Sequence, residues 1–179
     1  MLNEARILEE VPGLYRVVLL NLFRKTPGVL FDNVPTNAFA HIDAIDRVMH
    51  EPNAVSPGPV GDIRTTWYMH PHQEDNLIVL HGVRHVELYT KKHGRIERFA
   101  VSAAAITHQD RAVSNAPAML CWPTGVFHRV ISGPDGSAAI NFARHHPGID
   151  IRANFNIYEL DTETGRFSVA REGHSDQPL

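Results

Sequence analysis

Residues 67–82 read WYMHPHQEDNLIVLHG, and this stretch carries most of the information about the fold. Aromatic and aliphatic residues that run up to a closing glycine, here Gly82, are typical of a β-strand. Side chains two positions apart on a strand point to the same face, so His70 and His72 are predicted to face one metal ion. Taken alone, an exposed polar pair on a strand would explain the same two histidines.

A second stretch, residues 123–128, reads PTGVFH. Proline and glycine here predict a tight turn, and His128 then begins the next strand. Such a turn fixes the direction of one side chain, that of His128.

Together the two stretches resemble the motifs of the cupin superfamily. Its first motif is His-x-His with a nearby carboxylate and a glycine, as in residues 70–82, and its second is Pro-x-Gly-x-x-His, as in residues 123–128. The resemblance covers residues 61 to about 145. It implies an all-β double-stranded β-helix, a jelly-roll barrel whose mouth binds one metal ion through a carboxylate and three histidines: His70, His72 and His128.

The resemblance leaves two choices for that carboxylate. Counting back from Gly82 selects Asp75 as the fourth ligand, and Glu74 is the second choice. Arg64, Pro117 and Ser132 depart from the framework residues of the family.

The interior of the barrel is predicted to be a mostly apolar cavity for a small organic molecule. Strand alternation would direct Tyr68 and His81 inward, together with Leu77 and Val79. Arg64 and Arg129 could bind a substrate carboxylate, although alternation also allows Arg129 to lie on the outer face. The predicted substrate-binding residues are therefore Arg64, Tyr68, His81 and Arg129.

The rest of the chain adds three predicted hairpins, each centred on a glycine turn. They span residues 88–101, 127–142 and 157–169. Residues 61–179 are expected to form the cupin barrel and residues 1–60 an N-terminal extension that packs on it, within a single domain. The structure of residues 1–50 stays open.

Composition restricts the partners and the location. The chain has 179 residues, 43% of them hydrophobic, and a net charge of −3, which disfavours nucleic acid. We expect a cytoplasmic protein that does not insert in a membrane, because Cys121 is the only cysteine and no export signal or long apolar run is visible. A homodimer is expected, since exposed sheet edges need covering.

Three functions fit the resemblance. The first is a metal-dependent dioxygenase or isomerase of a small organic molecule, with an iron, manganese, nickel or zinc ion and, in the cell, iron or manganese. The second is a metal-independent sugar-nucleotide epimerase or ketoisomerase, because residues 73–89 also resemble a strand pair of those enzymes. They use a histidine, a tyrosine and a lysine, and Asn76 stands near the place of the lysine. The third is a cupin that binds a small ligand without catalysis.

Overall fold

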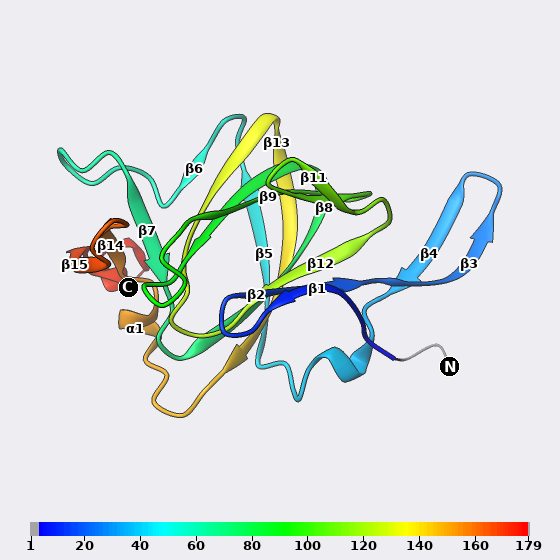
Figure 1. Cartoon of the computed structure of the whole chain (residues 1–179), viewed down its shortest axis with the longest axis horizontal. Helices are drawn as coiled ribbons and strands as arrows, with labels where there is room; N and C mark the ends of the chain where they lie inside the picture. The colour runs from blue at the N-terminus through cyan, green and yellow to red at the C-terminus, as the bar shows by residue number, and fades with distance from the viewer. Residues whose placement is uncertain (1–3, 179) are drawn as a thin grey trace.

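The computed structural model describes residues 4–178 and is built almost entirely of β-strands, arranged as one antiparallel 13-stranded sheet and a separate two-stranded hairpin (Figure 1). The prediction of an all-β barrel is confirmed. The strands are β1 (Arg6–Val11), β2 (Tyr15–Leu19), β3 (Asn21–Thr26), β4 (Val29–Asn33), β5 (Ala44–His50), β6 (Val55–Ser56), β7 (Thr66–Met69), β8 (Gln73–Tyr89), β9 (Glu97–Ser102), β10 (Ile106–His108), β11 (Arg111–Ser114), β12 (Ala118–Trp122), β13 (Phe127–His145), β14 (Ile157–Asp161) and β15 (Arg166–Arg171). The helical turns are η1 (Thr36–Ala38), α1 (Ile151–Asn154) and η2 (Gly173–Asp176).

Two long strands, β8 and β13, form the frame of the barrel. They pair with each other over nearly their whole lengths, and the register shifts between Ser132 and Ser137. Gly82 lies opposite this shift with a φ of +69°, and a Cβ built on it would stand 2.0 Å from the carbonyl oxygen of Gly136. Only glycine therefore allows the two strands to approach so closely.

The predicted hairpin over residues 127–142 is wrong. Residues 133–136 form a bulge inside the continuous strand β13, and the segments on both sides of it pair with β8 instead of with each other. Glycine and proline suit a bulge as well as a turn, so the sequence did not distinguish them. The hairpins predicted at residues 88–101 and 157–169 are present as β8–β9 and β14–β15.

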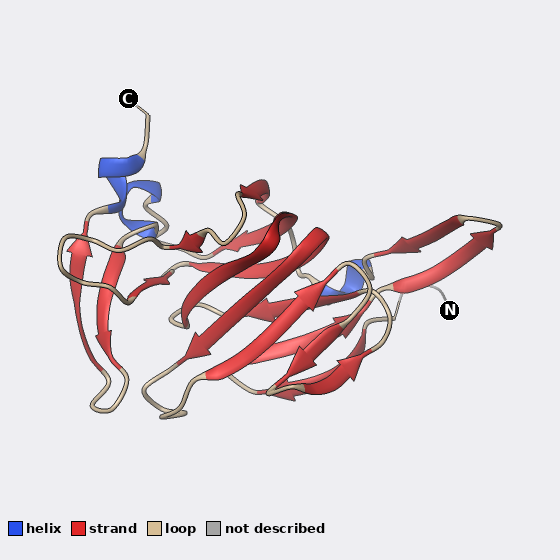
Figure 2. Cartoon of the chain, turned by 90° about the horizontal axis from the view of Figure 1, so that it is seen from above, coloured by secondary structure: helices blue, strands red, loops and turns tan. Residues whose placement is uncertain are grey.

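The first sixty residues supply strands to the same sheet. β2 pairs with β12, while β5 and β6 pair with β13. The β3–β4 hairpin is different, because it projects away from the barrel at the end opposite to β14 and β15 (Figures 1 and 2).

The core lies inside the barrel and follows strand alternation. Leu77 and Val79 point inward as predicted and pack with Val86, Leu88 and Leu120. A second apolar cluster on the outer side of β8 and β12 includes Cys121, where burial raises the pKa of the thiol to about 12. This buried thiol is a packing residue.

No helix among residues 4–178 has the length and apolar character needed to span a bilayer.

Candidate functional site

The barrel encloses a cavity of about 360 Å³, which is within the range of small-molecule sites. Its walls come from β5, β6, β7, β8, β12 and β13, and Phe155 contributes from the segment after α1. Its lining residues are Asp46, Val48, His50, Ser56, Tyr68, His70, Gln73, Asp75, Leu77, Arg84, Trp122, His128, Val130, Asn141 and Phe155.

Three potential ligand groups converge in this cavity. His70 follows β7, Asp75 lies on β8 and His128 lies on β13, and their ligand atoms are all within 4.8 Å of one another. Oδ2 of Asp75 is 3.5 Å from Nε2 of His70 and 4.0 Å from Nε2 of His128. All three side chains are buried.

Hydrogen bonds to the backbone orient both imidazoles. Nδ1 of His70 donates to the carbonyl oxygen of Asn154, and Nδ1 of His128 donates to that of Val126 at 3.1 Å. Because a carbonyl oxygen can only accept, each Nδ1 carries a hydrogen, and the Nε2 of each ring faces Asp75. Burial, and then the neighbouring His70, lowers the pKa of His128 to about 4, so its ring is neutral at pH 7.

The carboxylate of Asp75 is held on one side only. Its Oδ1 accepts from the side-chain amides of Gln73 at 2.8 Å and Asn141 at 2.7 Å. Gln73 in turn accepts from the amide of Asn154, so α1 helps to position the group. Within residues 4–178, Oδ2 of Asp75 has no hydrogen-bond partner. This buried oxygen can therefore accept a proton or bind a cation.

His72 lies apart from this cluster. β7 ends at Met69 and β8 begins at Gln73, so His70 and His72 flank a break at Pro71, and the same-face rule for strands does not apply to them. The ring of His72 instead approaches the backbone of Gly148. The predicted set of three histidines is thus reduced to two.

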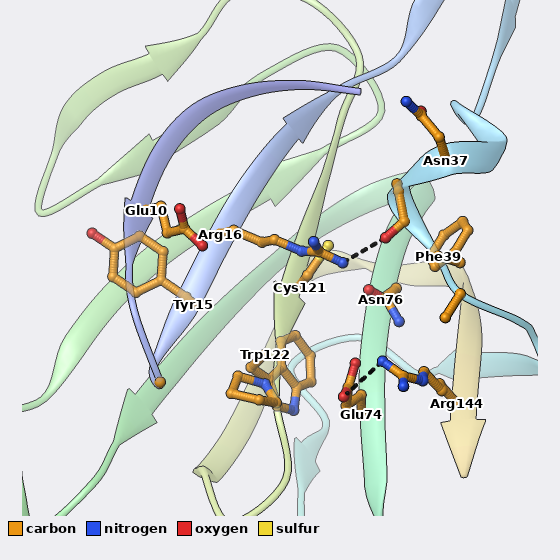
Figure 3. Close-up of a pocket in the computed structure, with 14 residues that line it drawn as sticks. Glu10, Tyr15, Arg16, Asn37, Phe39, Glu74, Asn76, Cys121, Trp122 and Arg144 are labelled. Carbon is orange, nitrogen blue, oxygen red and sulfur yellow. Dashed lines mark hydrogen bonds and ion pairs between the residues drawn. The ribbon is translucent and has the colours of Figure 1, made fainter. Parts of the chain in front are cut away.

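The two carboxylates considered as fourth ligand face opposite sides of β8. Asp75 points into the barrel. Glu74 points outward and pairs with Arg144 at 3.3 Å and with His146 at 2.7 Å, beside a second cavity that also contains Arg16 (Figure 3). Of these two carboxylates, only Asp75 lies beside His70 and His128.

The four predicted substrate-binding residues also divide between the cavity and the outer surface. Tyr68 lines the cavity, with its ring centroid 6.1 Å from that of His70, and burial raises the pKa of its phenol. His81 and Arg64 are exposed to solvent. Arg129 lies on the outer face, over the ring of Trp67 and 3.4 Å from Glu87. Tyr68 alone of the four lines the cavity.

Sequence reasoning missed both basic residues that line the cavity beside the histidine pair, His50 and Arg84, and the acid Asp46. Arg84 could have been found, because it alternates with the inward-facing Val86 and Leu88 on β8. Nothing in the sequence around His50 indicated that β5 pairs with β13 and contributes to the wall.

Comparisons with known proteins find the fold among solved structures. No family model matches the chain, and no curated protein matches it significantly. One similar structure is NovW, a 4-keto-6-deoxy sugar epimerase from the novobiocin biosynthetic gene cluster of Streptomyces spheroides. Its TM-score is 0.57 at 11% identity, covering 80% of this chain and 71% of NovW.

Two further structures are of the same kind. The dTDP-4-dehydrorhamnose 3,5-epimerase from Sulfolobus tokodaii has a TM-score of 0.57 at 13% identity, covering 81% of this chain and 77% of the enzyme. The rmlC epimerase of Mycobacterium tuberculosis has a TM-score of 0.54 at 12% identity, covering 80% of this chain and 70% of the enzyme.

These findings contradict the prediction of a metal-dependent dioxygenase or isomerase. The similar structures are sugar epimerases, which agrees with the alternative stated from the sequence, and the three-histidine set on which the first prediction depended is not assembled. At such low identity the likeness extends to the fold and no further. The chain therefore has a cupin fold in the form found in sugar epimerases.

Proposed function

We propose that the protein is a metal-independent epimerase that moves a proton on the carbon next to the carbonyl of a small keto sugar or a related keto compound. The observation that carries the proposal is the buried, neutral His128, whose Nε2 lone pair faces the cavity beside the unpartnered Oδ2 of Asp75. A proton taken up at this Nε2 would be stabilised by the adjacent carboxylate.

Tyr68 supplies the second group that such a reaction needs. Its phenol lines the same cavity, and its ring centroid is 6.0 Å from that of His128. In the proposed reaction His128 removes the proton and the phenol of Tyr68 returns one to the other face of the carbon, which inverts the centre. Asn76 contributes nothing here, since its side chain bonds to the backbone of Phe142 and borders the other cavity.

The test is deuterium uptake from heavy water into 4-keto-6-deoxy sugars, followed by mass spectrometry with chelator-treated protein. We expect exchange that falls by about 100-fold or more in His128→Gln, the usual contribution of a general base. His81→Gln is the matched control because His81 is exposed, and it should leave the rate unchanged. Absence of exchange with every keto compound, or exchange that His128→Gln retains, would refute the proposal.

A divalent ion is a competing proposal for the same atoms. Two imidazole Nε2 atoms and an unpartnered carboxylate oxygen fit the ligands of iron, manganese, nickel or zinc, so His70, Asp75 and His128 would hold the ion. One Nε2 cannot bind a metal ion and accept a proton at once. Elemental analysis of the purified protein, compared with His70→Ala, separates the two: stoichiometric metal that the variant loses would favour the ion over the proton acceptor.

We further propose that the protein acts as a homodimer in the cytoplasm. The buried, reduced Cys121 is compatible with a reducing compartment, and the projecting β3–β4 hairpin offers an apolar surface to a second copy.

A further inference from the structure

Arg84 is a buried cation inside the barrel cavity. Its residue is 3% exposed, it lies on β8, and it forms part of the cavity wall. Its Nε donates to Oγ of Ser137 at 3.0 Å, and its Nη2 donates to the carbonyl oxygen of Val48 at 3.0 Å. Both acceptors are neutral.

No carboxylate in residues 4–178 forms an ion pair with Arg84. Asp46 is the acid on the neighbouring wall, and its Oδ2 accepts from Asn141 instead. Burying an unpaired guanidinium is unfavourable, and buried charges in proteins are normally paired. Although burial lowers the pKa of Arg84 to about 10, the group remains charged at neutral pH.

The wall beside Arg84 also has a free polar atom. His50 lines the cavity, and its buried Nδ1 has no hydrogen-bond partner among the described residues. Burial, and then the charge of Arg84, lowers the pKa of His50 to about 4, so it adds no competing charge at neutral pH. A guanidinium has five N–H donors, and the two bonds made by Arg84 leave both Nη1 hydrogens and one on Nη2 for a ligand.

We propose that Arg84 binds an anionic group, a carboxylate or a phosphate, of the small molecule that enters the barrel. A planar guanidinium with free Nη hydrogens matches two oxygens of such a group, and His50 can add a further hydrogen bond. This inference refines the proposed function, because it makes the substrate a keto acid or a phosphorylated keto compound. Anion binding itself does not depend on turnover.

The test measures binding of small probes to the full chain at pH 7 by calorimetry and thermal shift. The probes are acetate, pyruvate and inorganic phosphate, with acetamide as the neutral counterpart of acetate. We expect at least one anion to raise the melting temperature while acetamide does not. Stronger binding of pyruvate or of phosphate would distinguish the carboxylate from the phosphate source.

Two variants locate the binding. Arg84→Met should weaken binding of the tightest-binding anion by about tenfold or more. Arg84→Lys, which keeps the charge but loses the paired N–H donors of the guanidinium, should weaken it less. Without ligand, Arg84→Met should melt no lower than the natural chain, because it removes an unpaired buried charge. Should Arg84→Met fail to fold, Arg84→Lys still provides the comparison. Arg64→Met is the matched control, since Arg64 is exposed outside the cavity.

The possible results separate this inference from the proposed function. The inference would be overturned if the anions bound both Arg84 variants as tightly as they bind the natural chain. It would also be overturned if no anion bound the natural chain. His128→Gln should lose deuterium exchange but keep the anion-induced shift. Anion binding that requires Arg84 in a protein without any exchange activity would leave this inference standing and the epimerase proposal refuted.

Discussion

At the scale of single residues, Glu97 shows how this protein accommodates a buried charge. The residue is 1% exposed, and one carboxylate receives hydrogen bonds from His93, Arg95, His108 and Gln109. Burial acts to raise the pKa of Glu97, but these hydrogen bonds outweigh it and lower the pKa to about 2. The contrast with Arg84 is informative, because the protein satisfies this buried ion internally and leaves the other one without a counter-charge.

This network predicts a stability that depends on pH. Since the pKa of Glu97 is lower in the folded chain than its ordinary 4.5, its contribution is complete above about pH 4.5 and is lost as the pH falls toward 2. Glu97→Gln should lower the free energy of unfolding by roughly 2–3 kcal/mol at pH 7, and by much less near pH 2. Urea denaturation at both pH values measures the difference. Glu159→Gln, at an exposed position, should leave the free energy of unfolding nearly unchanged at either pH. If Glu97→Gln lost the same free energy of unfolding at both pH values, the stabilising role of the ionised Glu97 would be contradicted.

At the scale of elements, strand alternation predicted what lies within the regular first part of β8 and failed where strands end, bulge or pair at a distance. It placed Asp75 and Leu77 inside the barrel, because both lie within the regular part of β8. It misplaced His72, because Pro71 breaks the strand first. Alternation directed His81 inward, but Val79 and His81 pair with consecutive residues of β13, so the register shifts between them and His81 is exposed. The bulge in β13 and the contribution of β5 to the cavity depend on partners far along the chain, which local patterns do not encode.

The close approach of β8 and β13 at Gly82 predicts the effect of adding a single methyl group. Gly82→Ala would place a Cβ against the carbonyl of Gly136, so we expect a loss of about 3 kcal/mol or more in the free energy of unfolding. Gly13→Ala is the matched control, since Gly13 also has a positive φ, +79°, but has nothing within 4 Å of the new atom. Its cost should stay near 1 kcal/mol, the strain of the backbone conformation alone. Urea denaturation measures both losses. Equal losses in the two variants would show that the contact between Gly82 and Gly136 does not determine the cost.

At the scale of the whole molecule, the β3–β4 hairpin stands out because it lies outside the barrel. Among residues 4–178 it pairs with no other strand, and it exposes a set of large apolar side chains: Leu22 at 54%, Phe23 at 48%, Val29 at 49%, Leu30 at 53% and Phe31 at 36%. Leu22 and Leu30 also border a cavity of about 820 Å³ at the base of the hairpin, together with Leu19 and Leu20. An apolar projection beside a recess that several leucines line is a surface that a second copy, related by a twofold axis, could cover.

We therefore expect light scattering to give about twice the chain mass of 20.0 kDa at micromolar concentration. The double variant Leu22→Glu, Leu30→Glu should be monomeric with an unchanged circular dichroism spectrum, because two charges on each copy would be buried without partners in the dimer while the hairpin lies outside the barrel core. Ile45→Glu is the matched control: Ile45 is 64% exposed on β5, outside the hairpin, and its substitution should leave the dimer intact. A monomeric natural chain would refute the homodimer. A dimer that persists in the double variant would show that the interface lies elsewhere, at another edge of the sheet.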